Sequence, residues 1–429
     1  MSTPTGTPTS TPAGTPCGAP LGAPLGPPLS VVIGAGGTGG HIYPGLALAE
    51  ALRAAVPGAV VSFVGTERGL ETDLIPGAGY RLHTVDMIPF DPSLGAKRYL
   101  LPAALLRSAR QARDVIRAQG AQVVVGMGGY PSAPAVLGAR LAGLPAVIHE
   151  SNAVPGRANR FAARLTPHIA VAFDRSRGHL AGGERALTTG MPISAALARL
   201  ASLGPAQRAD LRARARRELG VPGRRRLVVF NGGSLGAVRL TGAATELARR
   251  WRDRDDVTLL IKTGPAVLDR TAAELAASGG DRIARAVPYL DRMDLVYAAA
   301  DLVVCRAGSA TVAELAATGV PALLVPYPHA PGDHQTHNAR VLCDAGAGLL
   351  LADAETTGGR LAELVGPLLA DPGRLAAMAG AADPGPHARA AELLAAHVLR
   401  TAGLPAPPPS LCSPSSPSSP SLPFSLESA

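Results

Sequence analysis

Two glycine-rich loops, each between an apolar strand pattern and a helical pattern, constrain the fold of this chain most. The first, Gly34–His41, follows the apolar run Leu29–Ile33 and precedes a predicted helix over Gly45–Ala55. The second, Asn231–Ala237, follows the run Leu227–Phe230. Small residues let the backbone approach a polar ligand, and the start of the next helix offers unpaired N–H groups. The chain therefore repeats one device suited to binding phosphates.

Strand and helix patterns alternate through the rest of the chain. Further apolar strands are predicted at Val60–Val64, Val123–Gly126, Ala146–Ile148, Thr258–Ile261, Leu302–Cys305 and Ala322–Val325. Such alternation predicts parallel sheets with helices on both faces. Gly190 and Pro192 suit a turn between two halves. We therefore expect an α/β protein with two Rossmann-like domains whose sheets face each other across a cleft.

The domain boundaries follow from composition. Residues 1–28 are rich in Thr, Pro, Gly and Ala, and residues 404–429 are rich in Pro and Ser. Such segments bury too little apolar surface to offset their ordering entropy, so both are expected to be disordered tails. Between them we predict a first domain over 29–189 and a second over 193–380. A helical pattern over 386–400 is expected to pack back onto the first domain.

Composition also restricts the compartment. The chain has no run of about 18 apolar residues that would span a membrane, so we expect a soluble protein. No basic segment followed by an apolar core opens the sequence, which argues against a secretory signal. The four cysteines are far apart and form neither a disulfide framework nor a metal-binding spacing. A reducing cytoplasm fits best.

The net charge of +9 comes almost wholly from Arg, since Lys97 and Lys262 are the only lysines. Aromatic residues make up only 3% of the chain and do not alternate with basic ones, which disfavours nucleic acid as a partner. The positive charge can still be explained by binding to anionic lipid, by binding to phosphorylated substrates, or simply by the base composition of the genome. The segment Lys97–Arg107, with Arg110 and Arg113, is either a membrane-docking patch or an ordinary helix with one solvated face.

A dinucleotide site is a rival interpretation of the first loop. Gly34, Gly36 and Gly39 satisfy the pattern G-x-G-x-x-G. That site needs an acidic residue about 20 positions on, at the end of the second strand, whereas Glu67 comes later than expected. A nicotinamide-dependent oxidoreductase is therefore disfavoured.

The stretch Arg306–Glu314 is the most informative in the second half. It follows the strand Leu302–Cys305 and opens a helix that ends near Gly319. Residues Ser309–Thr311 are expected to form the first helical turn, aimed at a diphosphate. Glu314 lies three residues after Thr311, so it either completes a capping box or binds the two ribose hydroxyls.

Polar side chains gather at the predicted ends of other strands, in Gly126–Pro131, His149–Asn152 and Asp333–Asn338. They suit sugar hydroxyls. His334 and His337 with one carboxylate and no cysteine make a poor zinc site. The run Asp253–Asp256 resembles an acidic metal-binding motif, but it is better interpreted as the cap of a solvated helix end.

Together and in this order, these motifs resemble those of the MurG family of bacterial N-acetylglucosaminyltransferases. The resemblance covers about residues 29–400 and rests on Gly36–His41, Gly126–Tyr130, His149–Asn152, Pro155–Gly156, Ala158–Asn159, Gly232–Ala237, Arg306–Glu314 and Asp333–Asn338. It implies the GT-B fold, with the donor in the C-terminal half and a lipid-linked acceptor in the N-terminal half. It implies no cofactor and no metal.

The resemblance also implies roles for individual residues. On the donor side, the uracil lies against the backbone of Leu290, Glu314 binds the ribose, and Gln335 and Asn152 contact the GlcNAc hydroxyls. The donor diphosphate is expected to be bound by Ser234, Ser309, Ala310 and Thr311. Across the cleft, the sugar and the acceptor diphosphate meet Thr38, Gly39 and Gly40. Further acceptor contacts are assigned to Gly37, Tyr130 and Asn159.

Two catalytic assignments stay open. A general base is needed for the acceptor hydroxyl, and His41 is the first candidate with Glu150 as its rival. The family usually has Asn-Pro-x-Arg at the interdomain turn, whereas this chain has Ser194 in place of the arginine; by its position, Ser194 is expected to be a UDP-GlcNAc-binding residue. Helix N-termini, Lys262 or Arg306 are expected to take over stabilisation of the leaving group. Ser151 replaces the usual Gln of the His-Glu-x-Asn motif.

The implied reaction is inverting transfer of GlcNAc from UDP-GlcNAc to muramoyl-pentapeptide on undecaprenyl diphosphate. The implied location is peripheral, on an anionic membrane surface at the cytoplasmic face. Three alternatives remain: another UDP-sugar glycolipid transferase of the same fold, a nucleotide-binding oxidoreductase, and a scaffold that binds UDP-GlcNAc without turnover.

Overall fold

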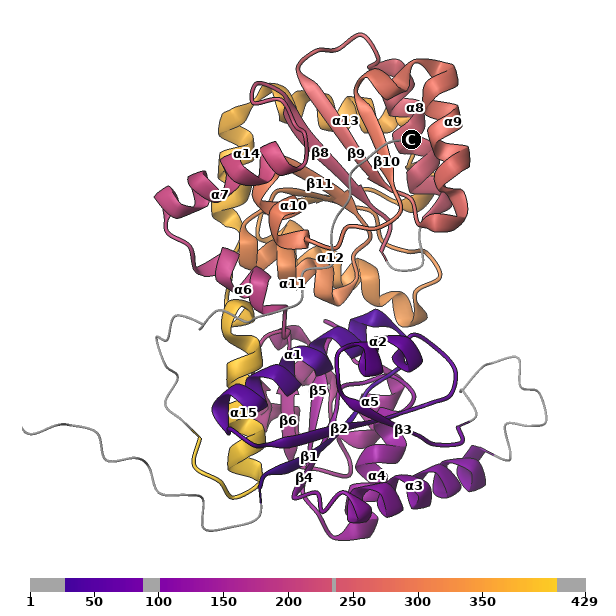
Figure 1. The fold of residues 1–429 in the computed structure, drawn as a ribbon, viewed down its shortest axis with the longest axis vertical. Coiled ribbons are helices and arrows are strands. Elements are labelled where there is room, and N and C mark those ends of the chain that lie inside the picture. The colour runs from indigo at the N-terminus through magenta and orange to yellow at the C-terminus, as the bar shows by residue number, and fades with distance from the viewer. Residues whose placement is uncertain (1–27, 88–100, 234–236, 407–429) are drawn as a thin grey trace, which may run out of the picture.

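The computed structural model describes residues 28–87, 101–233 and 237–406. Most of both predicted tails, residues Lys97–Leu100 of the basic–apolar segment, and Ser234 lie outside these ranges. Leu404 and Ala406, expected in the C-terminal tail, instead pack against the apolar core of the first half. The described chain forms two α/β halves, one above the other in Figure 1.

The first half is built on a parallel sheet of seven strands in the order β3-β2-β1-β4-β5-β6-β7. The strands are β1 (Ser30–Gly34), β2 (Val60–Gly65), β3 (Arg81–Thr84), β4 (Val123–Gly126), β5 (Ala146–Glu150), β6 (His168–Val171) and β7 (Leu187–Thr188). The helices are α1 (Gly39–Ala55), α2 (Glu71–Gly77), α3 (Leu101–Ala118), α4 (Ser132–Ala142) and α5 (Arg157–Ala162).

The second half repeats this plan with six parallel strands in the order β10-β9-β8-β11-β12-β13. The strands are β8 (Arg226–Asn231), β9 (Val257–Lys262), β10 (Ala284–Val287), β11 (Leu302–Cys305), β12 (Ala322–Leu324) and β13 (Gly348–Leu350). The helices are α6 (Ala195–Ser202), α7 (Pro205–Glu218), α8 (Val238–Arg250), α9 (Leu268–Ser278), α10 (Met293–Ala299), α11 (Ser309–Thr318), α12 (His334–Asp344), α13 (Gly358–Ala370) and α14 (Pro372–Ala381).

Alternate residues of each central strand enter different cores. In β1, Val31 and Ile33 face one apolar cluster and Val32 faces the other. In β8, Val229 belongs to the cluster on one face and Val228 to the cluster on the opposite face. Successive side chains of a strand point to opposite faces, so continuous apolar runs are needed where helices cover both. This explains why these strands show no polar alternation.

The C-terminal helix α15 (Ala390–Thr401) belongs to the first half in space. It contacts α1, and Figure 1 shows it running down the side of the lower half. Leu394 and Val398 are fully buried in the core that also contains Ile33. The chain therefore crosses between the halves twice. No helix within the described ranges is long and apolar enough to span a bilayer.

The two crossings are hydrogen-bonded to each other. The Met191 N–H donates to Nδ1 of His387 at 3.0 Å, and Nε2 of His149 lies 2.9 Å from the Gly190 carbonyl oxygen. The ring of His387 also packs edge-on against Phe173 at 5.4 Å. Burial lowers the pKa of both histidines to about 4, so they stay neutral at neutral pH. The two histidines that join the crossings are thus buried and uncharged.

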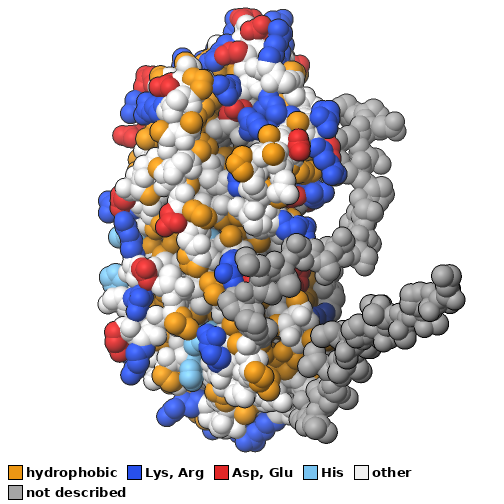
Figure 2. Space-filling model, turned by 90° about the vertical axis from the view of Figure 1, so that its left-hand side faces the viewer, with side chains coloured by type: hydrophobic (Ala, Val, Ile, Leu, Met, Phe, Trp, Pro, Cys, Tyr) orange, Lys and Arg blue, Asp and Glu red, His pale blue; other side chains and the backbone are white. Residues whose placement is uncertain are grey.

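Part of the arginine excess has a structural role in the second half. The buried carboxylate of Asp301 accepts from Arg212 and Arg226 at 2.9 Å each and from the Leu227 N–H at 2.8 Å, and it pairs with Arg216 at 3.4 Å. On the face in Figure 2, basic side chains lie over both halves among acidic ones. The net charge is therefore not gathered in one patch on that face.

Candidate active site

The first glycine loop is shorter than the sequence predicts. Helix α1 begins at Gly39 rather than Gly45, and Thr38 precedes it with an extended backbone. Gly39, Gly40 and His41 therefore form its first turn. The N–H groups of a first turn have no intrahelical partner, so this end of α1 can bind an anion. Thr38 gives no side-chain cap to these groups.

The ring of His41 lies against the loop that follows β4. A Cβ atom on Gly128 would lie 2.9 Å from His41 Cδ2, and one on Gly129 would lie 3.2 Å from His41 Nδ1. Both glycines also have positive φ angles, 88° and 74°. The two glycines are therefore needed for backbone conformation and for the space that the histidine ring fills.

Local contacts define the electrostatic state of His41. Its Nδ1 lies 3.2 Å from Oγ1 of Thr38. Burial, and then the charge of His334 in the second half, lower the pKa of His41 to about 4, opposed by a hydrogen bond to the Gly36 backbone. The imidazole is consequently neutral at neutral pH, as a proton acceptor must be.

Glu150 has a different environment. Its side chain is 2% exposed, and its two oxygens accept hydrogen bonds from the Asn152 and Gly156 N–H groups and from the amides of Asn152 and Asn159. Burial raises the pKa of Glu150 against these bonds. The carboxylate organises the loop after β5, because both of its oxygens accept hydrogen bonds from that loop and from Asn159.

Two predicted acceptor residues differ in access. Tyr130 is 44% exposed, and its ring lies 3.9 Å from the position of a Cβ atom on Gly37. Asn159 is only 3% exposed and donates to the His149 carbonyl oxygen as well as to Glu150. Its Oδ1 has no hydrogen-bond partner among the described residues. Tyr130 can touch a ligand directly, whereas Asn159 lies beneath the surface.

In the second half, helix α11 begins as expected at Ser309, after the strand β11. Its N-cap is Gly308, which has no side chain to occupy the first N–H groups of the helix. The N–H groups of Ser309–Thr311 therefore remain for a ligand. The alternative capping-box interpretation of Thr311 and Glu314 is wrong, because Thr311 lies inside the helix and Glu314 lies in its second turn.

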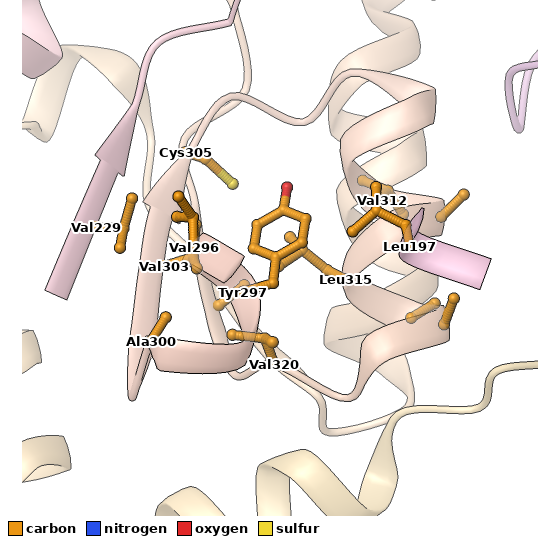
Figure 3. Close-up of a cluster of buried hydrophobic side chains, with 14 of the residues drawn as sticks. Leu197, Val229, Val296, Tyr297, Ala300, Val303, Cys305, Val312, Leu315 and Val320 are labelled. Carbon is orange, nitrogen blue, oxygen red and sulfur yellow. The ribbon is translucent and has the colours of Figure 1, made fainter. Parts of the chain in front are cut away.

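Glu314 is held by a residue from another helix. The Tyr297 hydroxyl on α10 donates to Glu314 Oε2 at 3.0 Å. Figure 3 shows the Tyr297 ring between β11 and α11, among Cys305, Val312 and Leu315. Burial raises the pKa of Glu314 to about 7, although the Tyr297 bond lowers it. The carboxyl group is thus anchored between α10 and α11 of the second half.

Gln335 and Leu290 border the same region. The Gln335 Oε1 accepts from the Ala307 N–H at 3.2 Å and from the Tyr327 N–H at 2.9 Å, which ties the loops after β11 and β12 together. Leu290 is partly buried and packs against the core below α11. Ser234, the other predicted diphosphate ligand, lies outside the described residues.

Three residues are relevant to the arginine that the family has at the interdomain turn: Ser194 occupies its position, and Arg306 and Lys262 were expected to replace its function. Ser194 is the N-cap of α6, and its hydroxyl oxygen accepts from the Leu197 N–H at 3.4 Å. Arg306 is paired with Asp353 at 2.7 Å and donates to the carbonyl oxygens of residues 325 and 326. Lys262, at the end of β9, donates to the Gly233 carbonyl oxygen at 3.2 Å, beside the second glycine loop. Lys262 therefore contacts that loop directly, whereas the Arg306 guanidinium is engaged by Asp353.

The candidate site residues of the first half and those of the second half meet at the boundary between the halves. Asn338 on α12 accepts from the Ala153 N–H at 2.8 Å and donates to the Asn152 Oδ1 at 3.2 Å. Helix α1 also contacts α11.

Two cavities of about 330 and 280 Å³ lie elsewhere, beside His168 and Asp301, and no predicted site residue lines them.

Sequence reasoning missed several residues that build this region. Glu71 accepts from the Gly37 N–H, Tyr297 holds Glu314, and Asn338 joins the two halves. Asn338 stood within a predicted motif without a role of its own. Glu71 and Tyr297 gave no local signal, because their partners lie on other elements.

The sequence matches two models of glycosyltransferase family 28, its N-terminal domain over residues 31–171 and its C-terminal domain over 227–394. A protein of Desulforudis audaxviator is 40% identical over 358 residues, which cover 81% of this chain and 92% of that protein. A protein of Mycobacterium tuberculosis H37Rv is 42% identical over 386 residues, or 87% and 89% of the two chains. Both are named UDP-N-acetylglucosamine–N-acetylmuramyl-(pentapeptide) pyrophosphoryl-undecaprenol N-acetylglucosamine transferase. The chain belongs to this family.

The structural comparison agrees. The crystal structure of MurG from Acinetobacter baumannii superposes with a TM-score of 0.67 at 27% identity, covering 87% of this chain and all of that one. The predicted GT-B fold is therefore confirmed, and so is the predicted membership of the MurG family. The chain is a glycosyltransferase.

Proposed function

We propose that this protein transfers GlcNAc from UDP-GlcNAc to the 4-hydroxyl of muramoyl-pentapeptide on undecaprenyl diphosphate, with inversion. The observation that carries the proposal is that α1 and α11, two helices with uncapped starts, contact each other across the boundary between the halves. The start of α1, with His41, belongs to the first half, and the start of α11, near Glu314, belongs to the second. Two anion-binding ends suit two diphosphates, one in each substrate.

In this proposal His41 is the general base. With a hydrogen on Nδ1 directed to the Gly36 carbonyl and the Thr38 hydroxyl, Nε2 keeps its lone pair. Nε2 takes the proton of the acceptor hydroxyl while that oxygen forms a bond to the anomeric carbon. The bond from this carbon to the diphosphate breaks, and UDP departs with the electron pair. We favour His41 over Glu150 because both Glu150 oxygens already accept several bonds.

The donor is held by the second half. The N–H groups of Ser309–Thr311 receive the diphosphate, and Glu314 receives the ribose hydroxyls in a charge-assisted bond. Lys262 supplies the cation in place of the family's arginine, because Arg306 is engaged by Asp353. The leaving diphosphate is thus stabilised by fixed dipoles and one ammonium group.

We also propose that α3 docks on an anionic membrane surface at the cytoplasmic face. Its inner side is buried, with Ala109 close to Gly138 of α4. Leu106 stays 38% exposed, and Leu101 and Leu105 are only partly buried. Arg107 and Arg110 are exposed nearby. A partly exposed apolar edge with a basic flank suits peripheral binding to anionic lipid.

Transfer of labelled GlcNAc tests the main proposal. The full chain is incubated with labelled UDP-GlcNAc and a lipid I analogue, and the labelled disaccharide-lipid and UDP are quantified. Formation of the β-linked product supports the proposal. A chain that binds UDP-GlcNAc but transfers it to no lipid-linked muramoyl acceptor, or only to a different glycolipid, would refute it.

A further inference from the structure

Glu71 is a buried carboxylate behind the first glycine loop. It opens α2 and is 0% exposed. Its Oε2 accepts from the Gly37 N–H at 2.9 Å, and its Oε1 accepts from the Thr66 hydroxyl at 2.7 Å and the Thr66 N–H at 3.3 Å. One side chain therefore joins the end of β2 to the loop between β1 and α1.

Neighbouring glycines leave space for this carboxylate. A Cβ atom on Gly36 would lie 2.6 Å from Glu71 Oε1, and one on Gly69 would lie 2.5 Å from Oε2. Any larger residue at either position would displace the carboxylate or the loop. These glycines are thus needed to make space for the Glu71 carboxylate, and not only to let a ligand approach the backbone.

The bond to Glu71 decides which N–H groups face a substrate. The Gly37 N–H points to the carboxylate and is not available to a phosphate. The groups that remain are those of Thr38, Gly39 and Gly40 at the start of α1, where the helix dipole is positive. A negative charge behind Gly37 further disfavours a phosphate there.

We propose that Glu71 is a positioning residue for the acceptor. It holds the loop so that the acceptor diphosphate binds at the start of α1, in the same turn as His41, and not at Gly37. This inference rests on the proposed transferase function, because it assumes a diphosphate-bearing acceptor. It predicts that Glu71 affects binding of the acceptor far more than binding of the donor, whose nucleotide is held by the other half.

The test is the Glu71→Gln variant of the full chain, assayed with varied UDP-GlcNAc and varied lipid I analogue. Gln has the same size, but its side-chain NH₂ group cannot accept a hydrogen bond, so it would face one of the N–H groups of Gly37 and Thr66 that now donate to the carboxylate. We expect the KM for the acceptor to rise at least about fivefold, while the KM for UDP-GlcNAc stays within about twofold. The matched control is Asp73→Asn, which removes an exposed charge from the same helix and is expected to change neither KM.

A second variant covers the case in which Glu71→Gln fails to fold. Thr66→Val removes the 2.7 Å bond and keeps the carboxylate, and we expect a smaller rise of the acceptor KM alone. A folded variant with unchanged KM values, or with equal changes in both, overturns the inference. Failure of the wild-type chain to transfer GlcNAc would instead count against the proposed function.

Discussion

Glu314→Gln should have opposite effects on stability and donor binding. The pKa of Glu314 is 4.5 in its ordinary state and about 7 in the folded chain, because burial disfavours the charge. At about 1.4 kcal/mol per pKa unit, this interval corresponds to roughly 3 kcal/mol against folding. Solvent reaches part of the side chain, so we expect a gain of about 1–2 kcal/mol on substitution. Gln keeps an oxygen for the Tyr297 hydroxyl.

The difference in unfolding free energy between Glu314→Gln and the wild type should depend on pH. Below 4.5 the carboxyl is protonated in both the folded and the unfolded chain, so the variant and the wild type should unfold alike. As the pH rises from 4.5 to about 7, only the unfolded wild-type chain ionises freely, and the wild type loses stability relative to Gln. Above 7 the difference should be constant. Denaturant unfolding at pH 5 and pH 8 measures it.

Donor binding should change in the other direction. A charge-assisted hydrogen bond contributes about 1.5–3 kcal/mol, so the KM for UDP-GlcNAc at pH 8 should rise about tenfold or more. Glu274→Gln is the control, since Glu274 is an exposed carboxylate of the same half that pairs with Arg270. An unchanged donor KM, or a variant less stable than wild type at pH 8, would refute the reasoning.

Three further predictions concern the other proposed roles. His41→Ala should lower turnover at least about a hundredfold with little change in the donor KM, and a variant that keeps more than a tenth of wild-type turnover would contradict this. Because the pKa of His41 is about 4, the wild-type kcat/KM should fall on the acid side only near pH 4, well below 6.5. Lys262→Ala should raise the donor KM about tenfold and leave the acceptor KM unchanged; equal changes in both would exclude the assigned role. Replacing Leu101, Leu105 and Leu106 with Ser should abolish co-sedimentation with anionic vesicles while thermal unfolding stays cooperative, whereas loss of folding would show that these residues belong to the core.

The sequence by itself determined the fold class and the strand ends at which the candidate site residues stand. Apolar runs without polar alternation, each followed by glycines and a helix, specify buried parallel strands with open carboxyl ends. The strands that were predicted agree with observed ones to within one or two residues at each end, as β4 and β11 illustrate, whereas β3, β6, β7, β10 and β13 were not predicted. These features are local, because backbone preferences and periodicity are encoded over a few neighbouring residues. The start of α1 was misjudged since its glycines have weak helical preference, and packing of the helix overrides it.

Only the tertiary structure decided the partners of the functional groups. The Gly37 N–H meets Glu71, 34 residues away, and the Glu314 carboxylate meets Tyr297 from a different helix. Asn338 reaches Ala153 across 185 residues. The pKa values of His41 and Glu314 depend on burial by segments distant in sequence. A motif specifies which group stands at a strand end, but its charge state and direction depend on the desolvation and hydrogen bonds that the folded neighbours provide.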